Sequence, residues 1–150
     1  MALSVIGLIV ALAVLAPSML LVVLPPRPPV SLGFSAGRLA TALERCGQVG
    51  CLAFAAAFGP HAASPPAFVV VTAGLVAGYW ALWLRYVLGG RRARDLFAPV
   101  GPVPVPMAVL PVLTFATLAA WAASPWLALA ALALAAGHVP NSWAGRLATR

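Results

Sequence analysis

Glu44 has the most distinctive chemistry, because it is the single glutamate and lies beside an apolar run in TALERCGQVGCLAF, positions 41–54. Gln48 follows four residues later, and this spacing predicts both side chains on one face of a helix. Burial in apolar surroundings disfavours a charged carboxylate. We therefore expect Glu44 to face other helices, to be largely protonated, and to act as an acid or as a ligand for substrate, with Gln48 in the substrate site.

Glu44 also has a structural interpretation, in which it lies at the membrane interface and forms an ion pair with a nearby arginine such as Arg45. Two other ionisable residues are also expected to have no role in chemistry. Asp95 is expected to pair with the arginines beside it, and His61 is expected to be solvated in an outer loop. Glu44 is thus either a proton donor in a pocket or half of an interfacial ion pair.

Three aromatic residues, Tyr79, Trp83 and Tyr86, recur at i, i+4 and i+7 in GYWALWLRYVL, which places them on one helix face. Aromatic faces carry negative potential and stabilise cations. We expect these three side chains to bind an apolar substrate and any positive charge formed on it. The alternative is an aromatic belt at the membrane interface, which applies best to Trp80 and Tyr86.

The stretch GHVPNSW near the C-terminus contains His138, Asn141 and Ser142. We expect His138 to exchange protons with Glu44, as a second catalytic residue, and Asn141 to contact substrate. The alternative for His138 is an end residue that extends toward water.

Composition identifies the chain as an integral membrane protein. It has 150 residues, of which 63% are hydrophobic and 7% charged, whereas soluble domains carry about 25% charged residues. All nine basic residues are arginine, which suggests a high-GC genome such as that of an actinobacterium. Arginines beside membrane spans set topology and contact anionic headgroups, so the net charge of +7 does not indicate nucleic acid.

The elements that must position these residues are membrane-spanning helices. Apolar runs separated by proline, glycine and arginine predict an all-α bundle of five helices in a single domain, residues 1–150. The expected spans cover about residues 3–24, 39–58, 66–88, 105–123 and 125–139, with a Ser-Pro start to the fifth. The alternative for the fifth span is a continuation to Trp143, with Pro140 only kinking the helix. The first lacks the features of a signal peptide and is interpreted as a retained span.

Arginines predict the orientation. The first and third loops and the C-terminal tail carry arginine, and the second and fourth loops carry none. The positive-inside rule then places the N-terminus outside and the C-terminus inside a bacterial cytoplasmic membrane. Four of the spans have their polar, aromatic or proline-rich residues on the cytoplasmic side. One of these is the fourth span, which begins with the proline-rich stretch GPVPVPMAVLP. Irregular backbone at membrane depth is tolerated where it lines a cavity, so we expect a pocket open toward that leaflet.

The sequence contains motifs that are similar to those of a known group of proteins. They are LERCGQ, LRYVLGG, and the pair VPVPMAVLP and GHVPNS. The chain resembles a group of small bacterial five-span proteins with E-R-x-G-Q, P-M-A-V-x-P and G-H-x-x-N-S motifs. It is also a small membrane protein that combines an acidic residue with aromatic residues. In these respects it resembles the membrane-bound terpene cyclases of actinomycete prenyl-indole pathways, the drimentine type. The second resemblance implies a terpene cyclase, an isomerase of terpenoid biosynthesis. It assigns no catalytic residue, and the role of Glu44 comes from the residues alone.

The leading hypothesis is cyclisation of a prenylated small molecule, started by a proton from Glu44. Protonation needs an acid shielded from water, and the cation formed needs aromatic faces. No DDxxD or NSE-type metal motif occurs, Cys46 and Cys51 have no zinc-site spacing, and no metal or other cofactor is expected.

Two other functions are open. The first is a proton-coupled small-molecule transporter, although no internal repeat supports it. The second is a non-catalytic membrane subunit, for which the small residues Cys46 and Gly50 would suit helix association. The expected partners are an apolar prenylated substrate and membrane lipid, with no nucleic acid, and association into a homo-oligomer is left open.

Overall fold

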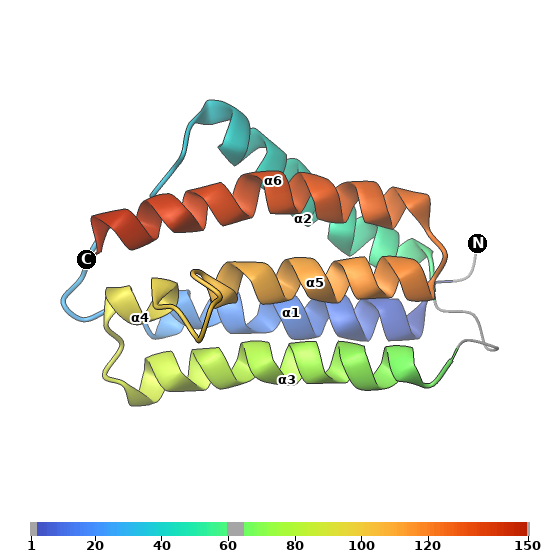
Figure 1. Cartoon of the computed structure of the whole chain (residues 1–150), viewed down its shortest axis with the longest axis horizontal. Helices are drawn as coiled ribbons and strands as arrows, with labels where there is room; N and C mark the ends of the chain where they lie inside the picture. The colour runs from blue at the N-terminus through green and yellow to red at the C-terminus, as the bar shows by residue number, and fades with distance from the viewer. Residues whose placement is uncertain (1–2, 60–64, 150) are drawn as a thin grey trace.

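The computed structural model describes residues 3–59 and 65–149, and the described part is all-α, as predicted. Figure 1 shows its elements. They are α1 (Val5–Val23), α2 (Arg38–Ala57), α3 (Ala67–Leu88), α4 (Ala93–Phe97), α5 (Pro106–Trp121) and α6 (Pro125–Ala148). The prediction for His61 lies outside the described residues.

Three helices of the described part, α1, α3 and α6, are long and apolar enough to cross a membrane. Their 19, 22 and 24 residues correspond to about 29, 33 and 36 Å at 1.5 Å per residue, against a bilayer core of about 30 Å. α5 is apolar but has only 16 residues, and α2 contains Arg38, Glu44 and Arg45. The membrane character is therefore supported by three helices, and the count of five spans remains a prediction.

The C-terminal part departs from the predicted boundaries. α6 does not end near Val139 but continues through Pro140 to Ala148, which places Arg146 in a helical turn rather than in a tail. Proline removes one backbone hydrogen bond, and in apolar surroundings the helix still satisfies more backbone groups than a loop would. The predicted start is confirmed, since the Ser124 side chain accepts a hydrogen bond from the Leu127 N–H. The short charged helix α4 was not predicted.

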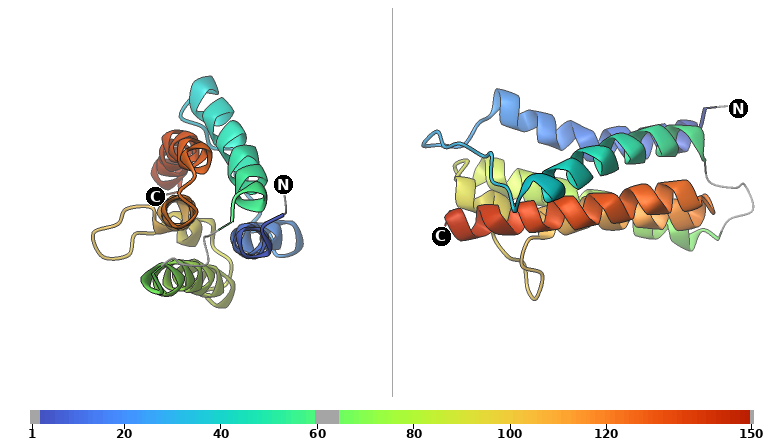
Figure 2. Two further views of the ribbon diagram at one scale, coloured as in Figure 1. Left: turned by 90° about the vertical axis from the view of Figure 1, so that its right-hand side faces the viewer. Right: turned by 90° about the horizontal axis from the view of Figure 1, so that it is seen from above.

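Pairwise contacts close the five long helices into a ring in the order α1, α2, α6, α5, α3 and back to α1. Figure 2 shows this ring from one end. The chain reverses direction between successive long helices, so the α1–α2 loop, the α3–α5 connection and the C-terminus gather at one end of the bundle (Figure 1). The arginine-bearing loops therefore lie together, as their alternation predicted.

Glycines bring α2 against α6. A Cβ at Gly47 would collide with the backbone of Leu134, and one at Gly137 would collide with the backbones of Ala40 and Glu44. Small residues allow this close approach of helices. α2 crosses α6 at an angle and diverges from α1 toward its own N-terminus (Figure 2). The divergence leaves space between α1 and the half of α2 that carries Glu44.

Candidate functional site

A central cavity of about 550 Å³ occupies this space, and residues of α1, α2, α3, α5 and α6 line it together with the connecting loops. Its volume lies within the range of about 300–1,000 Å³ that is typical of small-molecule sites. Most lining side chains are apolar, and the polar ones gather on α2 and α6. The lining includes Leu15, Ser18, Phe34, Glu44, Gln48, Leu52, Tyr79, Trp83, Phe97, Met107, Phe115, His138, Asn141 and Ser142.

The Glu44 carboxylate joins α2 to α6 through two hydrogen bonds. Its Oε1 lies 2.5 Å from His138 Nδ1, and its Oε2 accepts a hydrogen bond of 2.5 Å from Asn141 Nδ2. The Glu44 and His138 side chains retain about a fifth and a quarter of their accessible surface. Glu44 and His138 can therefore share one proton while they remain in contact with the cavity.

The amide of Asn141 is held by a second contact, because the Ala36 N–H donates a hydrogen bond of 2.8 Å to Asn141 Oδ1. An amide oxygen accepts and an amide nitrogen donates, so this contact requires Nδ2 to face Glu44. Asn141 is buried. The orientation of the carboxylate is thus fixed by a residue that is tied to the α1–α2 loop.

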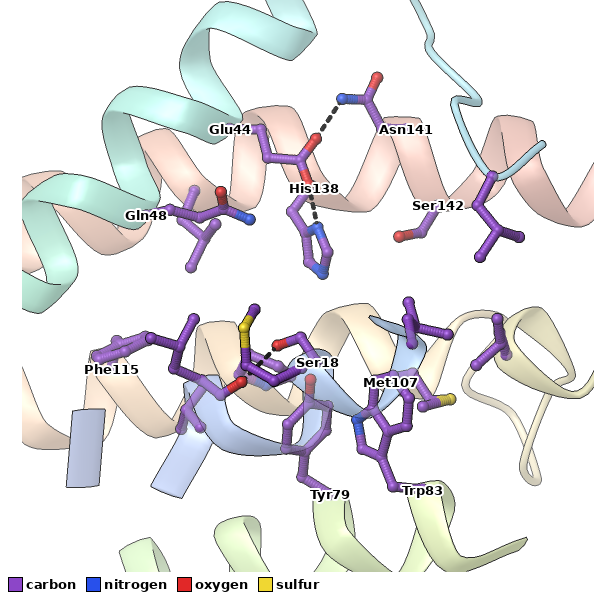
Figure 3. A pocket seen from close by; sticks show the side chains of 18 of the residues that line it. Ser18, Glu44, Gln48, Tyr79, Trp83, Met107, Phe115, His138, Asn141 and Ser142 are labelled. Atoms are coloured by element: carbon purple, nitrogen blue, oxygen red, sulfur yellow. Dashed lines mark hydrogen bonds and ion pairs between the residues drawn. The ribbon is translucent and has the colours of Figure 1, made fainter. Parts of the chain in front are cut away.

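His138 presents its second ring nitrogen to the cavity. Figure 3 shows the imidazole extending from α6 into the space between Glu44 and the opposite row of Ser18, Tyr79 and Met107. Because Nδ1 contacts Glu44, Nε2 is the ring nitrogen left to face a ligand. The arrangement is that of a general acid or base whose protonation is controlled by a carboxylate behind it.

Tyr79 and Trp83 form the opposite side of the cavity, on α3, with their rings edge to face and the centroids 6.3 Å apart. Both are buried, at 5% and 4% exposed. The indole Nε1 of Trp83 is buried and has no hydrogen-bond partner within the described residues. An unpaired buried donor is costly, so a hydrogen-bond acceptor on a ligand in the cavity would stabilise this site.

The structure brings most of the predicted site residues together. Glu44, Gln48, Tyr79, Trp83, His138 and Asn141 all line the cavity. Gln48 is more exposed than expected, and no hydrogen bond joins it to Glu44 among residues 3–59 and 65–149. Tyr86 lies outside the cavity, since it is fully buried and its hydroxyl donates to Leu24 O at 2.9 Å. The expected contact of Tyr86 with substrate therefore has no geometric support.

Several lining residues were not singled out from the sequence. Ser18 interrupts the apolar run of α1, and its hydroxyl donates to Leu15 O within the same helix. That single polar residue was a signal that could have been used. Phe34 and Phe97 meet edge to face with centroids 5.7 Å apart, and Phe34 lies in a loop where periodicity gives no signal.

The arginine interpretation of Glu44 is not what the described residues show. The carboxylate contacts His138 and Asn141, while the other acidic residue, Asp95, lies 4.0 Å from Arg94 as predicted. Arg85 donates to the backbone carbonyl of Asp95 at 3.1 Å. Within the described residues, no three His, Cys, Asp or Glu side chains gather as a metal site would require.

Comparison with protein-family models, with curated proteins and with solved structures finds no match for this chain.

Proposed function

We propose that the protein is a multi-pass enzyme of the bacterial cytoplasmic membrane that cyclises a prenylated small molecule by proton transfer. One observation carries the proposal: the Glu44–His138 pair lies at the edge of a large apolar cavity, opposite two buried aromatic rings. An acid, an apolar volume and π faces are what a proton-initiated cyclisation needs. In this proposal all five long helices span the membrane, with the C-terminal end inside.

In the proposed reaction, the pair gives its proton to the terminal epoxide oxygen or double bond of the bound chain, with His138 Nε2 as the delivering atom. The π electrons of the next double bond attack the electron-poor carbon that results, and the ring closes. The last cation loses a proton, which restores the pair, so no atom is gained or lost. An epoxide oxygen is far more basic than an alkene carbon, which makes an epoxide the easier substrate.

The remaining lining residues would control the cation. Tyr79, Trp83 and Phe115 offer aromatic faces, and Leu15 and Leu52 offer no nucleophile. Exclusion of water is essential, because water would capture the cation before the ring closes. Asn141 would act as a positioning residue, since it contacts Glu44 and holds the carboxylate in place.

The test is turnover by membranes that contain the protein, with a farnesylated indole and its terminal epoxide as substrates and mass-neutral cyclic products as the readout. Glu44→Gln keeps the shape of the side chain and removes the acid, so we expect a rate loss of about 10²- to 10⁴-fold. Asp95→Asn is the matched control, because it removes the other acidic side chain, which lies beside Arg94 and does not line the cavity. Full turnover by a correctly folded Glu44→Gln variant would contradict the mechanism.

One observation also favours a proton-coupled transporter. A carboxylate and an imidazole that share a proton at the edge of an open cavity can load and release that proton as a substrate moves. This function predicts flux into liposomes that depends on a proton gradient and leaves the substrate chemically unchanged. Chromatography of the recovered substrate separates the two functions, because a cyclase yields a cyclic isomer of the same mass and a transporter returns the substrate unaltered.

A further inference from the structure

A second concave surface lies at the end of the bundle where the arginine-bearing loops gather. We name it the arginine hollow, and its basic side chains are Arg27 from the α1–α2 loop and Arg92 and Arg94 from the segment between α3 and α5. The two segments are tied together, because the Arg27 N–H donates a hydrogen bond of 2.8 Å to Arg91 O. Three arginines from two segments far apart in the sequence thus line one concavity.

Among the described residues, Arg27 and Arg92 of the arginine hollow have no acidic side chain beside them. The whole chain has two acidic side chains. Glu44 is bound to His138 and Asn141, and Asp95 lies near Arg94 alone. Arg27 and Arg92 therefore have no carboxylate side chain available to them. Guanidinium groups bind phosphate through paired N–H donors, so a phosphate group would supply the missing negative charge.

The arginine hollow adjoins the central cavity. Phe34 lines both, and the other residues beside it on the cavity side, Leu32 and Phe97, are apolar. A molecule with a charged head and a hydrocarbon chain could therefore place its head among the arginines and its chain beside Phe34. A free inorganic anion would contact only the arginines and would leave the apolar residues beside Phe34 without a ligand.

We propose that the arginine hollow binds the phosphate group of an amphiphile whose hydrocarbon chain enters the central cavity past Phe34. The ligand class is a prenyl phosphate or diphosphate, and the same phosphate chemistry is offered by an anionic phospholipid headgroup. The proposal goes beyond cyclisation and does not rest on it, because it concerns binding alone. A protein that binds such a ligand but cyclises neither the farnesylated indole nor its epoxide satisfies this proposal and contradicts the proposed function.

The test measures binding to the full chain in neutral detergent, through the change in thermal unfolding temperature and in tryptophan fluorescence. The probes are farnesyl diphosphate, farnesol, inorganic pyrophosphate and phosphatidylglycerol. We expect farnesyl diphosphate to bind more tightly than farnesol or pyrophosphate. Loss of one charged hydrogen-bonding partner costs about 1.5–3 kcal/mol, so Arg27→Gln and Arg92→Gln should each weaken farnesyl diphosphate binding about tenfold or more and leave farnesol binding unchanged.

Arg38→Gln is the matched control, because it removes the same charge from an exposed position that lines neither concavity. It should bind farnesyl diphosphate as the unaltered protein does. If phosphatidylglycerol shows the same dependence on Arg27 and Arg92, the site is confirmed and a lipid headgroup is its source of phosphate.

Two results would overturn the proposal. The first is an affinity for farnesyl diphosphate that is the same in the Arg27, Arg92 and Arg38 variants. The second is binding of pyrophosphate as tight as that of farnesyl diphosphate, which would leave no role for the chain. If a variant fails to fold, competition on the unaltered protein decides, because pyrophosphate must then displace farnesyl diphosphate and not farnesol.

Discussion

The central cavity and the arginine hollow share Phe34 but treat charge in opposite ways. In the cavity, the one carboxylate has both oxygens bonded to side chains of a single neighbouring helix. In the hollow, Arg27 and Arg92 have no acidic side chain to pair with. The difference is that the carboxylate of the cavity has its partners within the protein, whereas Arg27 and Arg92 of the hollow have no acidic partner among the described residues.

The largest effect on turnover should come from the Glu44–His138 pair of the central cavity. His138→Gln should lower turnover about 10²-fold or more, and combining it with Glu44→Gln should cause little further loss, because residues that act as a unit are not additive. The measurement is a double-mutant cycle on cyclisation rate. Losses that multiply would mean that the two residues act separately, which breaks the description of the cavity as one unit.

The next effect concerns the helix contact that forms the pair. Gly137→Ala places a methyl group against the backbones of Ala40 and Glu44, and such overpacking should lower the free energy of unfolding by about 2 kcal/mol or more. Gly74→Ala is the control, since nothing lies within 4 Å of its added Cβ. Equal thermal unfolding of the two variants in detergent would show that the close α2–α6 approach does not hold the cavity together.

Asn141 gives an intermediate effect. Asn141→Ala removes the donor to Glu44 and the acceptor for the Ala36 N–H, and we expect turnover to fall about tenfold, since one hydrogen bond to a charged group contributes about 1.5–3 kcal/mol. The measurement is the cyclisation rate of the folded variant. Unchanged turnover by Asn141→Ala would show that the Glu44 carboxylate needs no fixed donor.

The smallest expected effect is a difference in the free energy of unfolding between variants of two tryptophans of α3. Trp80 Nε1 donates a hydrogen bond of 2.9 Å to Ala13 O, whereas Trp83 Nε1 is buried without a partner among the described residues. Trp80→Phe should lower the free energy of unfolding by about 1 kcal/mol. Trp83→Phe should leave it unchanged or raise it in the ligand-free protein, as measured by thermal unfolding.

Sequence patterns predicted the apolar helices well, because hydropathy reports directly on lipid or core burial. The observed α1 and α3 begin and end within two residues of the predicted spans. The end of α6 could not be predicted in the same way, since Pro140 usually marks a boundary and here lies inside a continuous helix. α4 has only five residues, of which Arg94 and Asp95 are charged, so no hydropathy signal marks it.

The candidate site was predictable as residue types and not as contacts. Spacing placed Glu44 with Gln48, and one short stretch contains His138 and Asn141. The Glu44–His138 contact, however, joins residues 94 positions apart. It depends on where α2 crosses α6, which the backbone clashes at Gly47 and Gly137 reveal. Tyr86 shows the converse. Its register matches Tyr79 and Trp83, yet the cavity ends before it and its hydroxyl bonds to Leu24 O.

The hydrogen bond from Ala36 to Asn141 Oδ1 has a mechanical consequence. Ala36 belongs to the same loop as Arg27 and Phe34, and Asn141 holds one oxygen of Glu44. A displacement of that loop that breaks the bond also frees the Asn141 amide to rotate, and Glu44 then loses a fixed donor. The entrance of the cavity and the strength of its acid are therefore joined by a single backbone N–H.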